Sequence, residues 1–241
     1  TIISARWNYI FNNRLFSNTT VSYNNYLFDI NAYTSNQYAL GNDETFTNRY
    51  SSDYRSGIND WNYQIDFDYN PSPVHHVKFG AGYIYHRFRP EVMTSKISDR
   101  TDDQTYRDTT YHNMNNSRIY AHEVSAYAED NLKISSRLRL NLGLHFSLFH
   151  VQKQSYFSLQ PRISARYQLT DDITLKASYT KMSQYVHLLS SMPIAMPTDL
   201  WVPVTKEIKP MQSHQYSLGG YYTGIKGWEF SVEGYYKDMR N

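Results

Sequence analysis

Histidines beside a second histidine or a basic residue are the first side chains in this sequence that suggest binding chemistry. His75 and His76 are adjacent, and they follow a turn that contains Pro73. Two neighbouring rings could bind one metal ion only if both pointed the same way, but successive side chains on a strand point to opposite faces. We therefore interpret the pair as polar residues at the end of a strand and predict no metal site there.

Acidic residues gather in a second candidate segment, residues 91–117, which contains Asp99, Asp102, Asp103 and Asp108. Their spacing does not match the calcium loop of an EF-hand, so a solvated polar loop explains them better. The sequence also lacks a Ser-His-Asp order above chance, a nucleophile elbow and a glycine-rich phosphate loop. We expect no catalytic residue, no metal and no cofactor.

Two further groups of residues could bind a ligand without catalysing a reaction. The pair at positions 86 and 87 lies near an expected loop and could contact an anionic ligand, or simply line the polar face of a strand. Segment 184–212 contains four prolines, which lower the entropy cost of holding one shape. Its tryptophan offers a flat apolar face to sugar rings or aromatic ligands, unless the segment packs on its neighbours and the ring is structural. The predicted substrate-binding residues are Tyr185, His187, Trp201, His86 and Arg87.

Strands must position these residues, because the sequence alternates apolar and polar residues over long stretches. In residues 137–150, RLRLNLGLHFSLFH, every second residue is leucine or phenylalanine. Successive side chains point to opposite faces, so one face of such a strand is apolar and the other polar. No window shows comparable helical periodicity. We predict about ten strands, near residues 1–10, 15–34, 53–69, 75–89, 118–133, 137–150, 157–169, 173–183, 213–223 and 228–238.

The connections between these strands alternate in length. Tight connections, rich in turn-forming residues, read FNNR, NPSPV, ISSR, TDD and TGIKG; the others are mostly longer, near 35–52, 91–117 and 184–212, and only the one near 151–156 is short. Tight turns at one end of a sheet and longer loops at the other are typical of an outer-membrane β-barrel.

Hairpin register supports this interpretation, because residues directly opposed in an antiparallel pair share a face. In each of four hairpins, one plausible turn centre places the apolar faces of the two strands together. The four centres are Ser72, Ser135, Asp171 and Ile225. The centre at Asp171 also places Arg166 opposite Lys176.

Amino-acid composition argues against several other classes of protein. The 241 residues carry a net charge of +2, so electrostatics gives no case for nucleic acid. Cysteine is absent while 24 tyrosines stand beside 11 phenylalanines, residues that favour strands and wet–apolar boundaries. No apolar stretch is long enough for a transmembrane helix. The sequence starts without Met in the middle of a strand pattern, so we expect it to be a piece of a longer protein.

A soluble β-sandwich also has one buried face per strand, but three features weigh against it. The strands are longer than usual, tight and long connections segregate by end, and charged residues such as Arg139 and Arg162 occur in mid-strand. We therefore expect the apolar face to contact lipid and the polar face to line a lumen. Aromatic residues near strand ends would form the interfacial girdle, including Trp7, Tyr9, Tyr69, Tyr167 and Trp228.

Three stretches of the sequence resemble a known family: NPSPVHHVKFGAGYIYHRFRP, SLQPRISARYQLTDDITLKASYTKMSQYVHLLSS and MPTDLWVPVTKEIKPMQSHQYSLGGYY. They resemble the barrel of TonB-dependent outer-membrane receptors, in the branch that includes the SusC-like transporters. Residues 158–222 are the most specific part of the resemblance. It implies that residues 1–241 form part of an antiparallel transmembrane barrel of about 22 strands with a plugged lumen. The plug does not appear in these residues.

The same resemblance implies a function. The whole protein would import a scarce nutrient, such as a glycan, siderophore, cobalamin or peptide, across the outer membrane. A TonB-type protein would supply energy through the plug, and a surface lipoprotein lid is a further possible partner. The alternative is a complete ten-stranded outer-membrane enzyme, such as an omptin-like protease, with catalytic residues at Asp99, Asp103 and His112.

Overall fold

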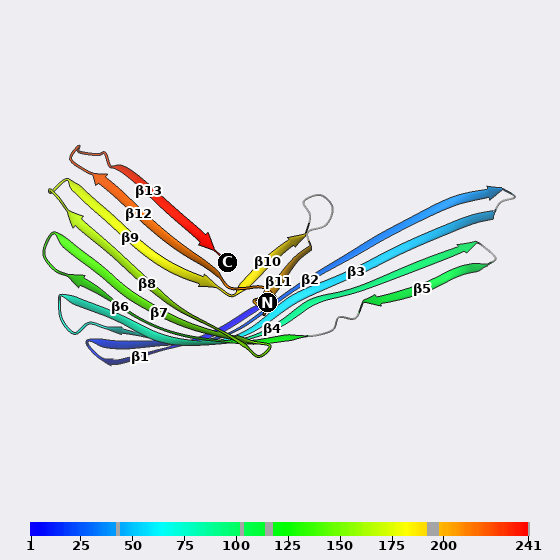
Figure 1. Ribbon diagram of the computed structural model, residues 1–241, viewed down its shortest axis with the longest axis horizontal. Helices are drawn as coiled ribbons and strands as arrows, with labels where there is room; N and C mark the ends of the chain where they lie inside the picture. Colours follow the sequence, from blue (N-terminus) through cyan, green and yellow to red (C-terminus); the bar gives the residue numbers. More distant parts are fainter. Residues whose placement is uncertain (42–43, 102–103, 114–117, 192–197, 241) are drawn as a thin grey trace.

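The computed structural model describes residues 1–41, 44–101, 104–113, 118–191 and 198–240, and all regular elements in these ranges are β-strands. Ten strands form one antiparallel sheet in the order β1-β2-β3-β4-β6-β7-β8-β9-β12-β13, β5 pairs with β4, and β10 and β11 form a separate hairpin (Figure 1). No helix within the described residues is long and apolar enough to cross a membrane. The strands are β1 Ile2–Asn12, β2 Leu15–Gly41, β3 Glu44–Tyr69, β4 His75–Thr101, β5 Thr105–Asn113, β6 Ile119–Lys133, β7 Leu138–Val151, β8 Gln154–Gln168, β9 Ile173–Gln184, β10 Val186–Ser191, β11 Thr198–Pro203, β12 Met211–Tyr222 and β13 Phe230–Arg240.

The two ends of this sheet differ. Tight turns join β1–β2, β3–β4, β6–β7, β8–β9 and β12–β13 at one edge, which we call the turn end. At the opposite edge, the loop end, β7 and β8 are joined through Gln152 and Lys153, whose φ angles of 46° and 66° suit a two-residue type I′ hairpin turn. Residues 42–43 alone separate β2 from β3, and residues 102–104 separate β4 from β5, whereas the connection from β9 to β12 is long and contains β10 and β11. The predicted tight turns are therefore confirmed, but most of the long connections predicted for the loop end are wrong.

Two predicted loops are wrong, because residues 35–52 and 91–117 largely continue as strands. β2, β3 and β4 contain 27, 26 and 27 residues, so each extends about 90 Å at 3.3 Å per residue. Together with β5 they form a projecting sheet, made of residues 25–41, 44–57, 89–101 and 105–113. Figure 1 shows it extending to the right of the other strands. Both faces of the projecting sheet are largely polar, so its strands lack the alternation of apolar and polar residues from which the other strands were predicted.

Hairpin registers keep the predicted faces but not all predicted partners. Tyr167 pairs with Leu175 and Arg166 with Lys176, as predicted. The other three hairpins are shifted by two residues: Phe67 pairs with Phe79 rather than Ile65 with Phe79, and the β6–β7 and β12–β13 hairpins shift likewise. A two-residue shift leaves every side chain on its face.

The outer face of the sheet is apolar. In β7 it carries Leu142 and Leu144, which are 42% and 47% exposed. Aromatic rings form two rows across it: Phe11, Phe67 and Phe79 are in contact near the turn end, and Tyr23 contacts Trp61 nearer the loop end. The five residues predicted for the girdle are all exposed large aromatics.

The inner face carries the polar residues and is the concave one. A hollow of about 980 Å³ lies on it at the turn end, and its lining residues come from the β3–β4 turn at one side and from β13 at the other. Only a sheet that curls around this face can bring those strands to one hollow. In the described residues β1 pairs only with β2 and β13 only with β12, so the curled sheet is open.

Candidate binding site at the loop end

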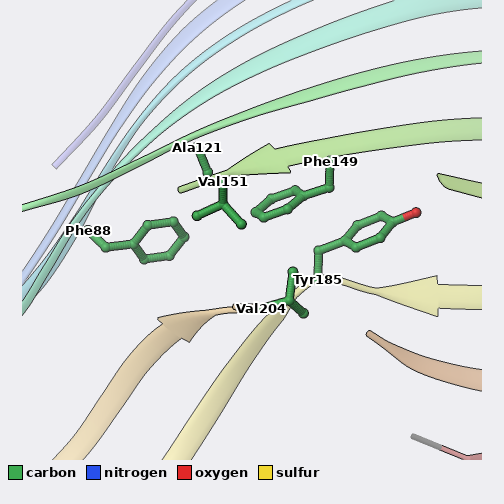
Figure 2. Packing of buried hydrophobic residues seen from close by; sticks show 6 residues of the cluster. All are labelled: Phe88, Ala121, Phe149, Val151, Tyr185 and Val204. Carbon is green, nitrogen blue, oxygen red and sulfur yellow. The ribbon is translucent and has the colours of Figure 1, made fainter. Parts of the chain in front are cut away.

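A buried apolar cluster occupies the inner face near the loop end. Four of its members come from the sheet: Phe88 on β4, Ala121 on β6, and Phe149 and Val151 on β7. Tyr185 and Val204 close the cluster from the connection between β9 and β12 (Figure 2). That connection therefore folds over the concave face, and its hairpin β10–β11 begins and ends at this cluster.

Tyr185 fixes the connection to the wall. Its ring stacks on Phe149 with centroids 5.0 Å apart and an interplanar angle of 7°, and its hydroxyl hydrogen-bonds to Ser147 Oγ at 2.7 Å. Gln160 donates to the same Oγ at 2.9 Å, and Val204 N donates to Tyr185 O at 2.8 Å. Burial raises the pKa of Tyr185, which lies beyond the end of β9, so the phenol stays protonated at neutral pH.

His86, on β4, also lies beside Phe149. Its Nδ1 is 2.8 Å from Asp60 Oδ1 and its Nε2 is 3.4 Å from Glu123 Oε2, while its ring centroid is 5.8 Å from that of Phe149. His86 is only 5% exposed. Each ring nitrogen of His86 thus faces a carboxylate, and these two contacts hold the ring in place on the wall.

Arg87 lies on the other face of the sheet. Adjacent residues of β4 alternate between faces, and Arg87 donates from Nη2 to Asn59 Oδ1 at 3.1 Å. The structure therefore brings His86 and Tyr185 into one cluster, but it does not bring Arg87 to them.

The hairpin β10–β11 carries the other two predicted residues. His187 pairs with Val202, and Trp201 pairs with Leu188 at the next position, so the two predicted side chains lie on opposite faces of the hairpin. Both are half-buried. Trp201 is thus presented by a strand rather than by a stiffened loop.

Residues proposed for chemistry form other contacts. Asp99 accepts a hydrogen bond from Asn48 and lies opposite Arg107, and Lys96 is 3.3 Å from Asp108. Asp102 and Asp103 lie outside the described residues, and so does the side chain of His112. The described residues contain no group of three or more histidine or carboxylate side chains placed to hold a metal ion.

His75 and His76 bind different carboxylates. His75 Nδ1 is 2.7 Å from Asp130 Oδ2, and His76 Nε2 is 3.0 Å from Asp68. The two rings therefore do not share a partner, as expected for adjacent residues on a strand.

The apolar cluster itself was not predicted. Its signal in the sequence is a local break in the alternation, because Phe149 and Val151 occupy positions that are polar in the rest of β7, such as Asn141 and Ser147. An apolar residue on the polar face of a barrel strand indicates that something covers the face there.

A family model described as TonB dependent receptor-like, beta-barrel, matches residues 1–241, the whole chain. The chain belongs to this family. The family match, the ten-stranded path and the open curled sheet together confirm the predicted fold class, part of a TonB-dependent receptor barrel. No curated protein matches the chain in sequence.

Solved structures of TonB-dependent receptors share its fold. The RagAB peptide transporter is 10% identical, with a TM-score of 0.58 over 99% of this chain and 30% of that chain. The ferric preacinetobactin receptor BauA from Acinetobacter baumannii is 12% identical, with a TM-score of 0.56 over 96% and 36%. FpvA of P. aeruginosa, bound to heterologous pyoverdines, is 12% identical, with a TM-score of 0.53 over 99% and 32%. The chain thus spans about a third of the length of each.

Proposed function

We propose that the whole protein is an active transporter of the outer membrane and that residues 1–241 are part of its barrel wall. The observation that carries the proposal is the pairing of an apolar outer face with a polar concave face along ten strands of a chain that belongs to the TonB-dependent receptor family. In this arrangement the wall does no bond chemistry. Energy comes from a TonB-type protein acting through a plug segment that is not among these residues.

The cargo is a nutrient too large for passive pores. The similar structures include a peptide transporter and receptors for ferric preacinetobactin and pyoverdines, so peptides and siderophores join glycans and cobalamin as candidates. A surface lipoprotein lid is a further proposed partner at the loop end, where the projecting sheet extends beyond the other strands (Figure 1).

Substrate contact is assigned to the hairpin β10–β11 and the wall beneath it. Trp201 and His187 are half-buried on the hairpin, which leaves part of each side chain accessible. Tyr185 and His86 are almost fully buried, so in this proposal they act by holding the hairpin and wall in place. Arg87, on the outer face, acts at the rim rather than in the lumen.

Uptake experiments test the proposal. The gene for the full-length protein is deleted in its host, and growth is measured on a panel of peptides, iron–siderophores, glycans and cobalamin as limiting nutrients. We expect one nutrient class to require both this gene and the TonB-type protein, with growth restored by the wild-type gene. Growth that stays independent of the gene on every class, with the protein present at normal level in wild-type cells, contradicts the proposal.

A further inference from the structure

β8 and β9 pair with each other over only part of their length. Residues 162–168 of β8 pair with residues 174–180 of β9. Within the described residues, the stretch 154–161 of β8 has no partner on β9, although all of it pairs with β7. β9 meanwhile stays paired with β12 as far as Gln184. The wall therefore opens at the loop end between residues 154–161 and 181–184 (Figure 1), and we call this opening the β8–β9 seam.

Pro161 explains why the pairing ends there. Leu169 N donates to the β9 residue Ile173, and every second residue of a strand directs its amide to the same neighbouring strand. Position 161 therefore faces β9, where a proline has no N–H to donate. Beyond it a side chain replaces the backbone as acceptor, because Ser183 N donates to Gln160 Oε1 at 3.3 Å.

The same alternation directs three further amides of β8 into the seam, those of Ser155, Phe157 and Leu159. None of the three has a strand partner on β9 in the part of the chain that the structure describes. Phe157 is 67% exposed on the outer face, and the hydrocarbon of a bilayer offers no acceptor to a backbone amide. The seam therefore suits an occupant that carries hydrogen-bond acceptors.

A pocket of about 520 Å³ lies in the seam, and its lining includes Ser158 on β8 and Ser183 on β9. Phe157 lines it from the outer face and Tyr156 from the inner face. The ring of Phe157 meets the ring of Phe146 edge-on, with centroids 4.7 Å apart. One side of the pocket thus continues the apolar outer face of the wall.

Three cations line the same pocket: Lys206 and Lys209 on the connection from β9 to β12, and Arg240 on β13. Neither lysine forms an ion pair with any of the described residues. Arg240 Nη2 lies 2.6 Å from Asp238 Oδ2, which leaves further N–H groups of the guanidinium available. Among the described residues that line the pocket there is no carboxylate. The pocket is therefore positively charged beside an apolar surface.

This combination matches the headgroup of a phosphate-bearing lipid. Phosphate oxygens accept hydrogen bonds from lysine, arginine and backbone amides, and basic pockets at the membrane surface bind anionic headgroups. The acyl chains attached to such a headgroup would lie along the apolar surface of Phe157 and Phe146. A free anion would use only the cations, and an uncharged lipid would use only the apolar side.

We infer that the β8–β9 seam binds the phosphate-bearing headgroup of an outer-leaflet lipid, with the acyl chains on the outer face at Phe157. The inference rests on the proposed function only in that the outer face contacts lipid and the loop end faces the cell exterior. It holds whichever nutrient is carried. It also gives Pro161 a role, which is to open the wall for the headgroup.

Native mass spectrometry of the full-length protein, purified in detergent and stripped of lipid, tests the inference. The probe is lipid A, a glycolipid whose sugar headgroup carries phosphate groups, and the matched probe is lipid A from which the phosphates have been removed. We expect saturable binding of lipid A, and binding of the dephosphorylated form that is weaker by about tenfold or more, because the charge-assisted hydrogen bonds are lost. Equal binding of the two forms overturns the inference.

Charge reversal locates the site. Lys206→Glu with Lys209→Glu should weaken the binding of lipid A by about tenfold or more, because repulsion replaces attraction. Lys133→Glu with Lys226→Glu is the control, since it makes the same change of net charge at two exposed side chains of the turn end, and it should bind like the wild type. Equal affinity in the two double variants overturns the inference. Heat-modifiable electrophoretic mobility shows that each variant is assembled, and Lys206→Gln with Lys209→Gln replaces a reversal that is not.

Inorganic phosphate separates a lipid site from a site for a free anion. Lipid A should bind more tightly than inorganic phosphate, and Phe157→Ala should weaken the binding of lipid A alone, because only the lipid has acyl chains to place against the ring. Phosphate that binds as tightly as lipid A, or lipid A binding that is unchanged in Phe157→Ala, overturns the inference. The uptake panel uses cells and nutrients rather than lipid titration, so failure of the transport proposal remains distinguishable from failure of this one.

Discussion

The ring of Tyr185 lies parallel to the ring of Phe149, at 5.0 Å and 7°, and so ties the connection between β9 and β12 to the inner face of β7 (Figure 2). Two contacts are combined in one residue, because the ring stacks while the hydroxyl reaches Ser147. The connection is therefore part of the wall's packing, not a free loop above it.

Tyr185→Ala should release this connection. Loss of the buried ring costs about 3 kcal/mol or more, and Tyr185→Phe, which keeps the stack but loses the hydroxyl contact, costs about 1 kcal/mol. Limited proteolysis of the assembled full-length protein measures the effect as cleavage within residues 186–203. Tyr33→Ala, at a side chain that is 65% exposed on β2, is the control. Equal protection in Tyr185→Ala and wild type would contradict the anchoring role.

Leu142 and Asn141 test the assignment of faces. Leu142 is exposed on the outer face of β7, whereas Asn141 donates to Asn131 Oδ1 at 2.7 Å on the inner face. Leu142→Arg should cost about 2–4 kcal/mol, the range for arginine facing the middle of a bilayer. Asn141→Arg should cost much less because it faces water. Refolding into lipid vesicles measures both, and equal losses would refute the assignment.

Gly80 allows a close approach on the inner face. A Cβ there would lie 2.5 Å from Ile65 O and 2.8 Å from the Tyr127 ring, whose hydroxyl donates to Asp66 at 2.8 Å. Gly80→Ala should therefore displace both the Ile65 carbonyl on the neighbouring strand and the Tyr127 ring, and cost about 1–3 kcal/mol. Gly234→Ala is the matched control, because no other group lies within 4 Å of its Cβ position. Urea unfolding in lipid measures both; a loss that is no larger for Gly80→Ala would contradict the close approach at this position.

The ten strands on the main path of the sheet, and their faces, could be predicted because alternation is a local property that lipid and lumen impose on every barrel strand. β5, β10 and β11 lie in segments predicted as loops and were missed. The hairpin registers could not be predicted in this way, because a shift of two residues leaves the alternation of faces unchanged. The deciding contacts are short: Ser72 Oγ accepts from Val74 N and His75 N, and Ser135 Oγ accepts from the corresponding two amides. In each case the turn is centred one residue after the hydroxyl, which moves the pairing by two.

The same argument explains the one register that was right. Thr170 Oγ1 accepts from the amides of Asp172 and Ile173, and the predicted centre, Asp171, already lay one residue after the hydroxyl. The position of a Ser or Thr at the start of a tight turn is thus the signal that was missed.

The projecting sheet and the loop-end cluster could not be predicted for different reasons. In the projecting sheet neither face is buried by a core, so Ser, Thr, Asn and Tyr alternate without an apolar side. The contact of Tyr185 with Phe149 joins the connection that follows β9 to a residue of β7, two strands away in the sheet, and alternation carries no information about such long-range contacts.

Trp201 is the sharpest test of the binding site. The residue pairs with Leu188 on the hairpin β10–β11 and is half-buried, so its ring can both pack and present a flat face. If the ring stacks on the nutrient, Trp201→Ala should weaken binding by about 1–3 kcal/mol, by analogy with aromatic platforms for nucleobases. Trp201→Phe should retain part of the affinity, and Trp61→Ala, an outer-face ring that is 55% exposed, should leave affinity unchanged. Binding is measured on the full-length protein with the nutrient class found by the uptake panel, alongside heat-modifiable mobility as a check on assembly. Wild-type affinity in an assembled Trp201→Ala protein would make the residue structural, and the hairpin would then serve the site through its packing on the wall alone.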